Sequence, residues 1–309
     1  MQHPELSTVA ELLKPITWFP PMWAFSCGVV SSGKSLTDNW VLIVWGVLLA
    51  GPLVCASSQA VNDWFDRHVD AINEPNRPIP SGRMPGRWGF YIAVLWTLLS
   101  IFWAWPLGPW GFAATALGLL LSWAYSTPPI RLKNNGWWGN SACALSYEGL
   151  AWVTGAAVML GGEMPSEKAI VLALLYSFGA HGIMTLNDFK AVDGDAQMGV
   201  RSLPVQLGVT KAAFTACGFM LFAQWAVAIL LLEWGSPNSA LAVLLLSVCQ
   251  LPLMLRFIQN PVEKALSVSA FGVPLFVSGM MVSAWSLRGL QEAALCTHYS
   301  HSLGFTSHA

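Results

Sequence analysis

The sequence has very little charge. Asp, Glu, Lys and Arg together make up 10% of its 309 residues, whereas soluble domains carry about a quarter. Hydrophobic residues make up 55% instead. This composition excludes an ordinary soluble domain and predicts a polytopic membrane protein in a lipid bilayer. The net charge of -1 provides no basic field, so we expect no nucleic-acid partner.

Cysteine motifs and a signal peptide are also missing. The six cysteines contain no Cys-x-x-Cys spacing, and most lie in apolar runs. We therefore interpret them as small apolar residues and not as a disulfide framework. Residues 1–14 are short and polar and include two acids, so they lack the basic-then-apolar pattern of a cleaved signal.

Long apolar runs are what the sequence has instead. A membrane-spanning helix needs about 17–25 predominantly apolar residues. Nine runs have this length: 15–33, 39–62, 88–106, 109–126, 138–160, 168–187, 211–233, 238–257 and 268–287. We therefore predict an all-α fold, a bundle of nine transmembrane helices within residues 15–290. Pro20, Pro21, Pro52 and Pro274 lie inside runs and predict kinks, and the polar segment 291–309 is expected to be disordered.

The distribution of basic residues predicts the orientation. Most of the 15 Lys and Arg residues lie in the N-terminal segment and in the loops after the second, fourth, sixth and eighth runs. By the positive-inside rule the N-terminal segment and these loops are cytoplasmic. The two long loops, 62–87 and 188–210, both fall on this side.

A cluster of acidic and amide side chains ends the second run. Asn62, Asp63, Asp66 and Asp70 lie within about 100° of one another on a helical projection. We therefore expect them to share one helix face. Their oxygen atoms suit a hard divalent cation such as Mg²⁺, which in turn holds a phosphorylated substrate. The plainer interpretation is a solvated helix end.

The same pattern returns after the sixth run, which disfavours that plainer interpretation. Asn187 and Asp188 end that run as Asn62 and Asp63 end the second. An Arg and a Pro three residues apart follow in both places, in 77–80 and in 201–204. Six of the seven aspartates in the protein lie in these two segments. The chain is thus predicted to have two pseudo-repeated halves with similar loops on one membrane face.

The second segment completes a predicted metal and diphosphate site. Asp188 and Asp195 are seven residues apart and are expected to share a helix face. Two facing carboxylate clusters repel each other unless cations lie between them, and two Mg²⁺ ions bridging a diphosphate would neutralise both. The predicted metal ligands are Asn62, Asp63, Asp66, Asp70, Asn187, Asp188 and Asp195.

Basic and aromatic residues in the same loops are candidates for the diphosphate itself. Charge-assisted hydrogen bonds to phosphate are expected from Lys190, Arg67, Arg77, Arg131, Lys133 and Arg201, although some of these only set topology. Lys190 either pairs with an aspartate or reaches a phosphate oxygen. Tyr125, at the end of the fourth run, either contacts the diphosphate or covers a reactive cation with its ring. With Asp66, Asp70, Asp188 and Asp195 it forms the predicted catalytic set.

Two ionisable residues lie inside apolar runs. Glu148 and His181 are functional candidates because charge is costly in a membrane. The alternative is that each is neutral and hydrogen-bonded to a neighbouring helix.

These motifs resemble the UbiA-type intramembrane prenyltransferases. The Asn-xxx-Asp-xxx-Asp pattern of Asn62, Asp66 and Asp70 carries the general resemblance. The sequence is similar to the chlorophyll and bacteriochlorophyll synthase branch in six segments: 14–21, 62–75, 77–82, 125–133, 187–195 and 201–205. The resemblance implies a nine-helix fold with a Mg²⁺–diphosphate cavity open to the cytoplasmic side of an inner, photosynthetic membrane.

The resemblance also implies a reaction. It is the esterification of the propionate of bacteriochlorophyllide with geranylgeranyl or phytyl diphosphate, with Mg²⁺ as cofactor and with pigment-receiving photosynthetic membrane proteins as partners. The wider family usually has Asp-xxx-Asp in the second segment, and here Ala191 occupies the first of those positions. Asp188 is expected to replace it.

Three other functions remain open at this point. A prenyltransferase with another acceptor, such as an aromatic acid for quinone synthesis, would share the acidic segments. A transporter built from two repeats would place its acids near the bilayer midplane, whereas here they end the runs. A pigment-binding assembly factor that has lost catalysis is the third.

Overall fold

The computed structural model describes the backbone of residues 3–302 and the side chains of residues 3–292. Helices make up most of that part, and its one β-bridge joins Asn135 to Arg201. The predicted all-α fold is therefore confirmed. The first half comprises α1 (Leu6–Leu13), η1 (Pro15–Thr17), α2 (Phe19–Ser31), α3 (Trp40–Leu48), η2 (Leu49–Cys55), α4 (Ala56–Asn73), α5 (Trp88–Ala104), η3 (Trp105–Leu107), α6 (Gly108–Ser126) and η4 (Leu132–Asn134).

The second half continues with a similar series of helices. These are α7 (Gly136–Ala144), η5 (Leu145–Leu150), α8 (Ala151–Met159), α9 (Glu167–Asp188), α10 (Val192–Gln197), α11 (Leu203–Leu207), α12 (Val209–Glu233), α13 (Pro237–Gln259), α14 (Pro261–Ser267), η6 (Val268–Gly272) and α15 (Val273–Ser302). The elements η2, η5 and η6 are π-helical turns, and η1, η3 and η4 are 3₁₀ turns.

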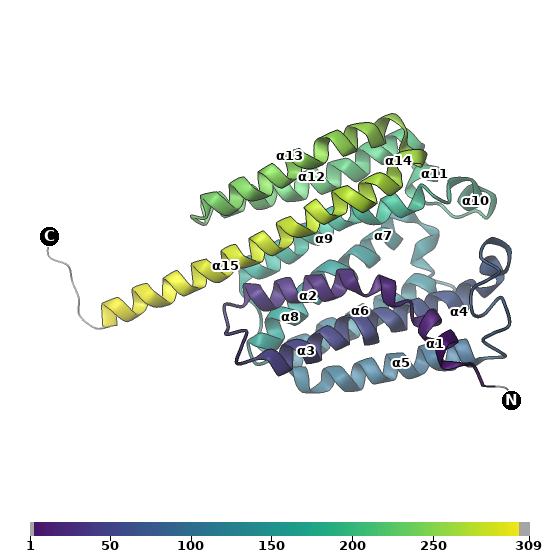
Figure 1. Ribbon diagram of the computed structural model, residues 1–309, viewed down its shortest axis with the longest axis horizontal. Helices are drawn as coiled ribbons and strands as arrows, with labels where there is room; N and C mark the ends of the chain where they lie inside the picture. The colour runs from purple at the N-terminus through teal and green to yellow at the C-terminus, as the bar shows by residue number, and fades with distance from the viewer. Residues whose placement is uncertain (1–2, 303–309) are drawn as a thin grey trace.

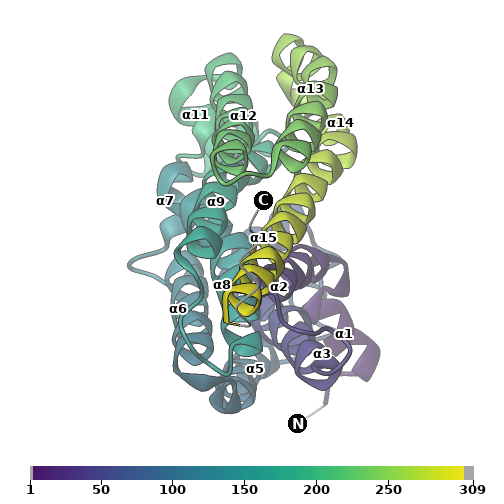
Figure 2. The ribbon, with the colours of Figure 1, turned by 90° about the vertical axis from the view of Figure 1, so that its left-hand side faces the viewer.

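The long helices lie roughly along one axis of the molecule (Figure 1). Seen from the end, α3, α5 and α6 lie on one side and α12 and α13 on the other, with α9 and α15 between them (Figure 2). The short elements α1, α10 and α11 gather at one end of the long axis, together with the loop that follows α4 (Figure 1). The two acidic segments are therefore at the same end of the bundle.

The predicted count of nine spans is not confirmed. Six helices among the described residues are long and apolar enough to cross a membrane. Three of the six are compound, because each joins several elements: Trp40–Asn73, Trp88–Ser126 and Pro261–Glu292. The second of these turns back at Gly108, whose φ of 80° ends η3 and lets α6 return along α5. The helix α2 has only 13 residues and falls below the length criterion.

The prolines inside apolar runs have different effects. Pro52 lies within the π-helical turn η2, as expected for a residue that removes a helical hydrogen bond. Pro20 and Pro21 lie in the first turn of α2, where missing donors cost nothing, so the kink predicted there is wrong. Pro274 follows the π-helical turn η6 at the start of α15.

The structure differs from the expectation of a disordered tail over 291–309. The helix α15 continues to Ser302, and residues 303–309 lie outside the described part of the chain. Two interactions extend the helix past the apolar run. Arg288 pairs with Glu292 one turn later at 3.0 Å, and the Gln291 amide donates to the backbone carbonyl of Ser31 at 3.1 Å.

Glycines permit close contact between α2 and α8. A Cβ atom added at Gly28 of α2 would lie 2.9 Å from the backbone nitrogen of Ala156 on α8. A Cβ atom added at Gly155 of α8 would lie 3.0 Å from the carbonyl carbon of Phe25. Small residues of this kind let membrane helices approach until their backbones touch.

We expect Gly28→Ala to lower the stability of the protein by about 1–3 kcal/mol, because the added methyl group forces α2 and α8 apart. Thermal unfolding of the purified protein in detergent measures the effect. Gly218→Ala on α12 is the matched control, since nothing lies within 4 Å of its added Cβ. Equal melting temperatures for the two variants would contradict this close packing.

Candidate active site

Asp66 on α4 is held by three other polar groups. The Asn62 amide, one turn earlier, donates to it at 3.0 Å. The Arg131 guanidinium donates to its other oxygen at 2.8 Å, and the Lys133 ammonium also pairs with it. Burial lowers the pKa of Lys133, while the Asp66 carboxylate opposes this effect. This group combines oxygen ligands with two cations, as a phosphate-binding site requires.

Asp63 and Asp70 face a different set of cations. Lys14, just after α1, lies 2.6 Å from Asp63, and Arg77 lies 3.5 Å from the same oxygen. Arg77 also donates to Asp70 at 2.8 Å. All four residues lie on the unbroken helix α4, as predicted, and their carboxylates interact electrostatically with one another. They pair with different cations, because Asp66 contacts Arg131 and Lys133, whereas Asp63 and Asp70 contact Lys14 and Arg77.

The loop between α6 and α7 connects the first acidic segment to the second. Its residues Arg131 and Lys133 bind Asp66, and its far end pairs with the segment after α10. There, Arg201 donates its backbone N–H to the carbonyl of Asn134 at 2.9 Å, and Gly136 donates to the carbonyl of Arg201 at 2.8 Å. Displacement of this loop would therefore disturb both segments.

Asp188 is the last residue of α9 and is largely buried. The Asn140 amide of α7 donates to it at 3.0 Å and also approaches the Thr185 hydroxyl at 3.3 Å. The predicted helical register between Asp188 and Asp195 is wrong, because α9 ends at Asp188 and α10 begins at Val192. The two carboxylates nevertheless interact electrostatically across the intervening turn. Burial raises the pKa of Asp195.

Tyr125 connects the two groups of carboxylates. Its side chain interacts electrostatically with Asp66, with Asp188 and with Cys143 of α7. The Lys133 ammonium lies 5.9 Å from the centre of its ring. Residue Tyr125, at the end of α6, thus interacts with carboxylates of both α4 and α9, which are far apart in the sequence.

Other predicted site residues lie outside the group formed by Asp66, Tyr125 and Asp188. Arg67 donates to the Trp64 carbonyl at 2.7 Å and lies over the Trp64 ring. Asn187, Lys190 and the side chain of Arg201 are exposed at the end of the bundle, where they are accessible to a ligand.

A further group of polar side chains, which no sequence motif predicts, surrounds the Tyr147 hydroxyl. The Tyr147 hydroxyl accepts from the Gln59 amide at 3.0 Å and lies 3.3 Å from Cys55. Asn140 was missed as well. These residues lie within apolar runs, and only the rarity of Gln and Asn in such runs signals them.

The two ionisable residues inside the apolar runs differ in their hydrogen bonding. The Ser141 hydroxyl lies 3.1 Å from Nδ1 of His181, whose ring stacks on Phe219. Glu148 is 3% exposed, and its Oε2 atom has no hydrogen-bond partner among the described residues. His181 is thus hydrogen-bonded to a neighbouring helix at Nδ1, whereas its Nε2 atom has no hydrogen-bond partner among the described residues.

The donor set fits a metal that is shared with a ligand. Among the described residues, no group of three or more His, Cys, Asp or Glu side chains could hold a metal ion alone. Mg²⁺ commonly binds one or two carboxylates and completes its shell with water and substrate phosphates. Asp66 with Asn62, and Asp188 with Asn140 nearby, each provide such a partial set.

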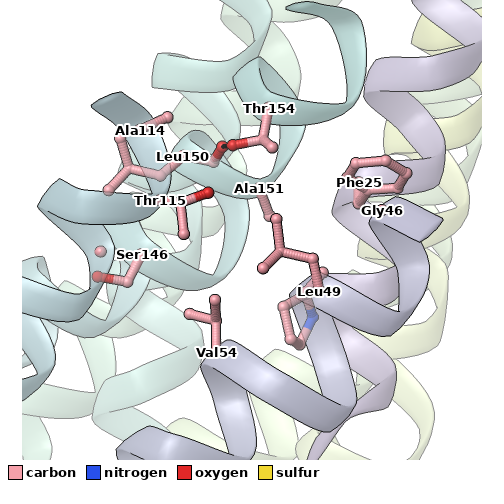
Figure 3. A pocket seen from close by; sticks show the side chains of 13 residues that line it. Phe25, Gly46, Leu49, Val54, Ala114, Thr115, Ser146, Leu150, Ala151 and Thr154 are labelled. Carbon is pink, nitrogen blue, oxygen red and sulfur yellow. Dashed lines mark hydrogen bonds between the residues drawn. The ribbon is translucent and has the colours of Figure 1, made fainter. Parts of the chain in front are cut away.

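A narrow apolar slot lies between elements of both halves, away from the carboxylates. Its cavity volume is about 40 Å³. Figure 3 shows side chains from η2, α6, η5 and α8 pointing toward one another around it. Its lining residues are Pro21, Phe25, Gly46, Leu49, Ala50, Val54, Ala114, Thr115, Gly118, Ser146, Leu150, Ala151 and Thr154.

Comparisons with known proteins agree with this architecture. A family model described as the UbiA prenyltransferase family matches residues 17–280. The chain is 57% identical to the bacteriochlorophyll synthase 33 kDa chain of Cereibacter sphaeroides, over 93% of this chain and 95% of the relative. It is 39% identical to the chloroplastic chlorophyll synthase of Oryza sativa, over 89% of this chain and 75% of the relative.

A solved structure of a UbiA homologue from Archaeoglobus fulgidus, bound to GPP and Mg²⁺, has the same fold. It superposes with a TM-score of 0.65 at 18% identity and covers 91% of this chain and 99% of that one. The predicted fold and the predicted family resemblance are both confirmed.

We expect Lys14→Met to destabilise the protein by about 1–3 kcal/mol, because Asp63 is 2% exposed and loses its nearest cation. The double variant Lys14→Met/Asp63→Asn should recover most of the loss, since no buried charge is left without a partner. Thermal unfolding in detergent measures both.

The control for this pair is Glu11→Gln, which breaks the exposed ion pair with Arg83 and should cause a much smaller change. A double variant that is no more stable than Lys14→Met would show that the pair with Asp63 does not account for the effect of Lys14.

Proposed function

The chain belongs to the UbiA prenyltransferase family, and on this premise we propose that it esterifies the propionate of bacteriochlorophyllide with geranylgeranyl or phytyl diphosphate. It is a multi-pass membrane enzyme that transfers a prenyl group. The acceptor is inferred from the relatives, which are named bacteriochlorophyll and chlorophyll synthases. The chain matches each of them over most of its length.

One observation carries the assignment to this chain. Asp66 and Asp188 come from different halves of the protein and both lie within electrostatic range of Tyr125. A single diphosphate between them would contact Arg131 and Lys133 on the same loop. The arrangement therefore supports binding of one dianionic or more highly charged group at the junction of the two halves.

Charge balance explains why such a site promotes transfer. Diphosphate is a poor leaving group until its negative charge is compensated. We assign Asp66 and Asp188, with Asn62 and Asn140, to hold Mg²⁺, which when bound supplies Lewis-acid neutralisation. A neighbour of the same fold holds GPP and Mg²⁺, which supports this cofactor. Arg131 and Lys133 add hydrogen bonds to the phosphate oxygens.

The reaction requires no proton transfer from the protein. A carboxylic acid with an ordinary pKa of about 4 is ionised at neutral pH. Its oxygen forms the ester bond to C1 of the prenyl group, and the electron pair of the broken C–O bond leaves with diphosphate. Positive charge that develops on the allylic carbon is stabilised by the ring of Tyr125. The apolar helices around the site exclude water, which would otherwise yield the alcohol.

The remaining assignments follow the same proposal. Asp195, Lys190 and Arg201 extend the site from the second segment, whereas Asp63 and Asp70 with Arg77 support α4. The N-terminal segment and both acidic segments face the cytoplasm of an inner photosynthetic membrane, where photosynthetic membrane proteins receive the pigment. An aromatic-acid acceptor and an inactive assembly factor are less well supported, because the most similar relatives reported above are named synthases of pigments.

We expect Asp66→Asn and Asp195→Asn to lower prenyl transfer by at least about 100-fold, because each removes a charge that holds the metal or its ligand. The measurement is the conversion of bacteriochlorophyllide to an apolar ester in membranes supplied with geranylgeranyl diphosphate and Mg²⁺. Folding is checked by elution and melting in detergent. Normal activity in either folded variant would count against the site.

Removal of divalent cations with EDTA should abolish the same conversion, and added Mg²⁺ should restore it. The protein itself should keep its melting temperature in EDTA, because Asp66 is already paired with Arg131 and Lys133. Transfer that continues at full rate in excess EDTA would rule out the proposed role of the metal.

A further inference from the structure

The polar group around the Tyr147 hydroxyl joins the two halves of the protein. The Gln59 amide of α4 donates to that hydroxyl at 3.0 Å, and the Cys55 sulfur at the end of η2 lies 3.3 Å from it. Tyr147 itself belongs to the π-helical turn η5 of the second half. None of the three side chains carries a charge at neutral pH, since ordinary thiols and phenols ionise only at higher pH. The group therefore offers hydrogen bonds without charge, unlike the acidic segments.

This group lies deeper in the bundle than the candidate active site and on the same side of α4. Gln59 and Asp66 are seven residues apart on the unbroken helix α4, so they share a face and are about 10 Å apart along its axis. Tyr147 interacts electrostatically with Cys143, four residues earlier, and Cys143 interacts in turn with Tyr125. Four residues correspond to about 6 Å along a helix. The level of Tyr147 is therefore about one helical turn below that of Tyr125.

The donors of this group bind only weakly to one of their present neighbours. A glutamine amide has two N–H groups, and Gln59 directs one of them to Tyr147. The Cys55 sulfur interacts both with the Gln59 amide and with the Tyr147 hydroxyl. Sulfur is a weak hydrogen-bond acceptor, and both Gln59 and Tyr147 are only half-buried. A negatively charged oxygen would therefore replace the sulfur as the partner of these donors.

We propose that Gln59 and Tyr147 bind the propionate carboxylate of the acceptor and hold it against C1 of the prenyl group. This inference rests on the proposed function. In an in-line transfer the carboxylate oxygen bonds to C1 from the side opposite to the departing diphosphate, which leaves with the electron pair of the broken C–O bond. A single bond of about 1.5 Å and a reactive contact of about 3 Å place that oxygen roughly 5 Å from the leaving oxygen. The level of Tyr147, one turn below Tyr125, matches this distance.

Uncharged donors suit an acceptor that must not compete with the diphosphate. A Lys or Arg at this level would also attract the diphosphate, which carries more negative charge than a carboxylate, and would bind the donor in the wrong place. With Gln59 and Tyr147 there instead, the diphosphate stays with Arg131 and Lys133. Acceptors that end in an alcohol or a phenol form no charge-assisted hydrogen bonds with these donors. The group thus selects carboxylic acids as acceptors.

The experiment measures the KM values of both substrates in the wild type, in Gln59→Leu and in Tyr147→Phe. We expect the KM for bacteriochlorophyllide to rise at least about tenfold in each variant, because a hydrogen bond to a charged group is lost. The KM for geranylgeranyl diphosphate should stay within about twofold of the wild type. The share of diphosphate substrate that ends as prenyl alcohol should rise, since water then reaches C1 in place of the carboxylate.

The methyl ester of bacteriochlorophyllide tests whether charge recognition, and not the shape of the pocket, is lost. It has the same ring system, carries no carboxylate at the propionate and cannot be esterified there. We expect its inhibition constant against the acceptor to change by no more than about threefold in Gln59→Leu, because a neutral hydrogen bond contributes less than a charged one. An equal loss of affinity for the acid and the ester would reject carboxylate recognition by Gln59.

The matched control is Tyr176→Phe. Its hydroxyl is also hydrogen-bonded inside the bundle, to Ser283 at 2.7 Å, but it belongs to no part of the candidate active site. This variant should keep both KM values and the share of prenyl alcohol. If Tyr147 only holds helices together, Tyr147→Phe will resemble Tyr176→Phe, with a lower melting temperature and unchanged KM values. That result would overturn the role of Tyr147 in acceptor binding.

Two further outcomes separate this inference from the proposed function. An active wild type, with an unchanged KM for bacteriochlorophyllide in both folded variants, would overturn the assignment of Gln59 and Tyr147 and leave the proposed function intact. A folded wild type that transfers no prenyl group to bacteriochlorophyllide would overturn the proposed function itself. If Gln59→Leu does not fold, Tyr147→Phe decides alone, because it removes a single oxygen atom and keeps the ring.

Discussion

The pairing of Asp66 with Arg131 and Lys133 is the interaction on which the site depends. A carboxylate at the end of a membrane helix is costly unless cations compensate it, and here both cations come from one short loop. The same loop pairs through its backbone with Arg201 in the second half. The ion pairs of Asp66 with Arg131 and Lys133 thus position the loop that joins the two acidic segments.

The acidic residues therefore have two separate roles. Asp66 and Asp188 interact electrostatically with Tyr125, and in the proposed function they bind a metal and its diphosphate. Asp63 and Asp70 neutralise Lys14 and Arg77, which attach the N-terminal helix and the loop after α4 to the bundle. Because Lys14 and Arg77 are already paired with carboxylates, we assign Arg131 and Lys133 to the proposed diphosphate. The excess of acids in the two segments thus does not correspond to an equal number of metal ligands.

Much of the fold and part of the site could be predicted from the sequence. Apolar runs placed the long helices correctly, and the repeated Asn-Asp pairs identified the two segments that lie at one end of the bundle. Helical projection predicted the shared face of Asp63, Asp66 and Asp70, but it contains no information on which cations pair with each carboxylate. It failed between Asp188 and Asp195, where the helix ends and a turn replaces the register.

Other features depend on contacts that no local pattern contains. Asn140 becomes important only because α7 packs beside the end of α9, and the slot exists only because η2 and η5 meet. Pro52 predicts a break in its own helix, but η5 contains no proline, and its π-helical turn has no comparable signal in the sequence.

The central claim is that one diphosphate binds between Asp66 and Asp188 and connects the two halves of the protein. The most direct measurement is a structure of the protein with Mg²⁺ and geranylgeranyl thiolodiphosphate, which is not cleaved. The account predicts metal density between the diphosphate and both carboxylates, with Arg131 and Lys133 on the phosphate oxygens. A diphosphate bound to only one of the two segments, or away from Tyr125, would contradict it.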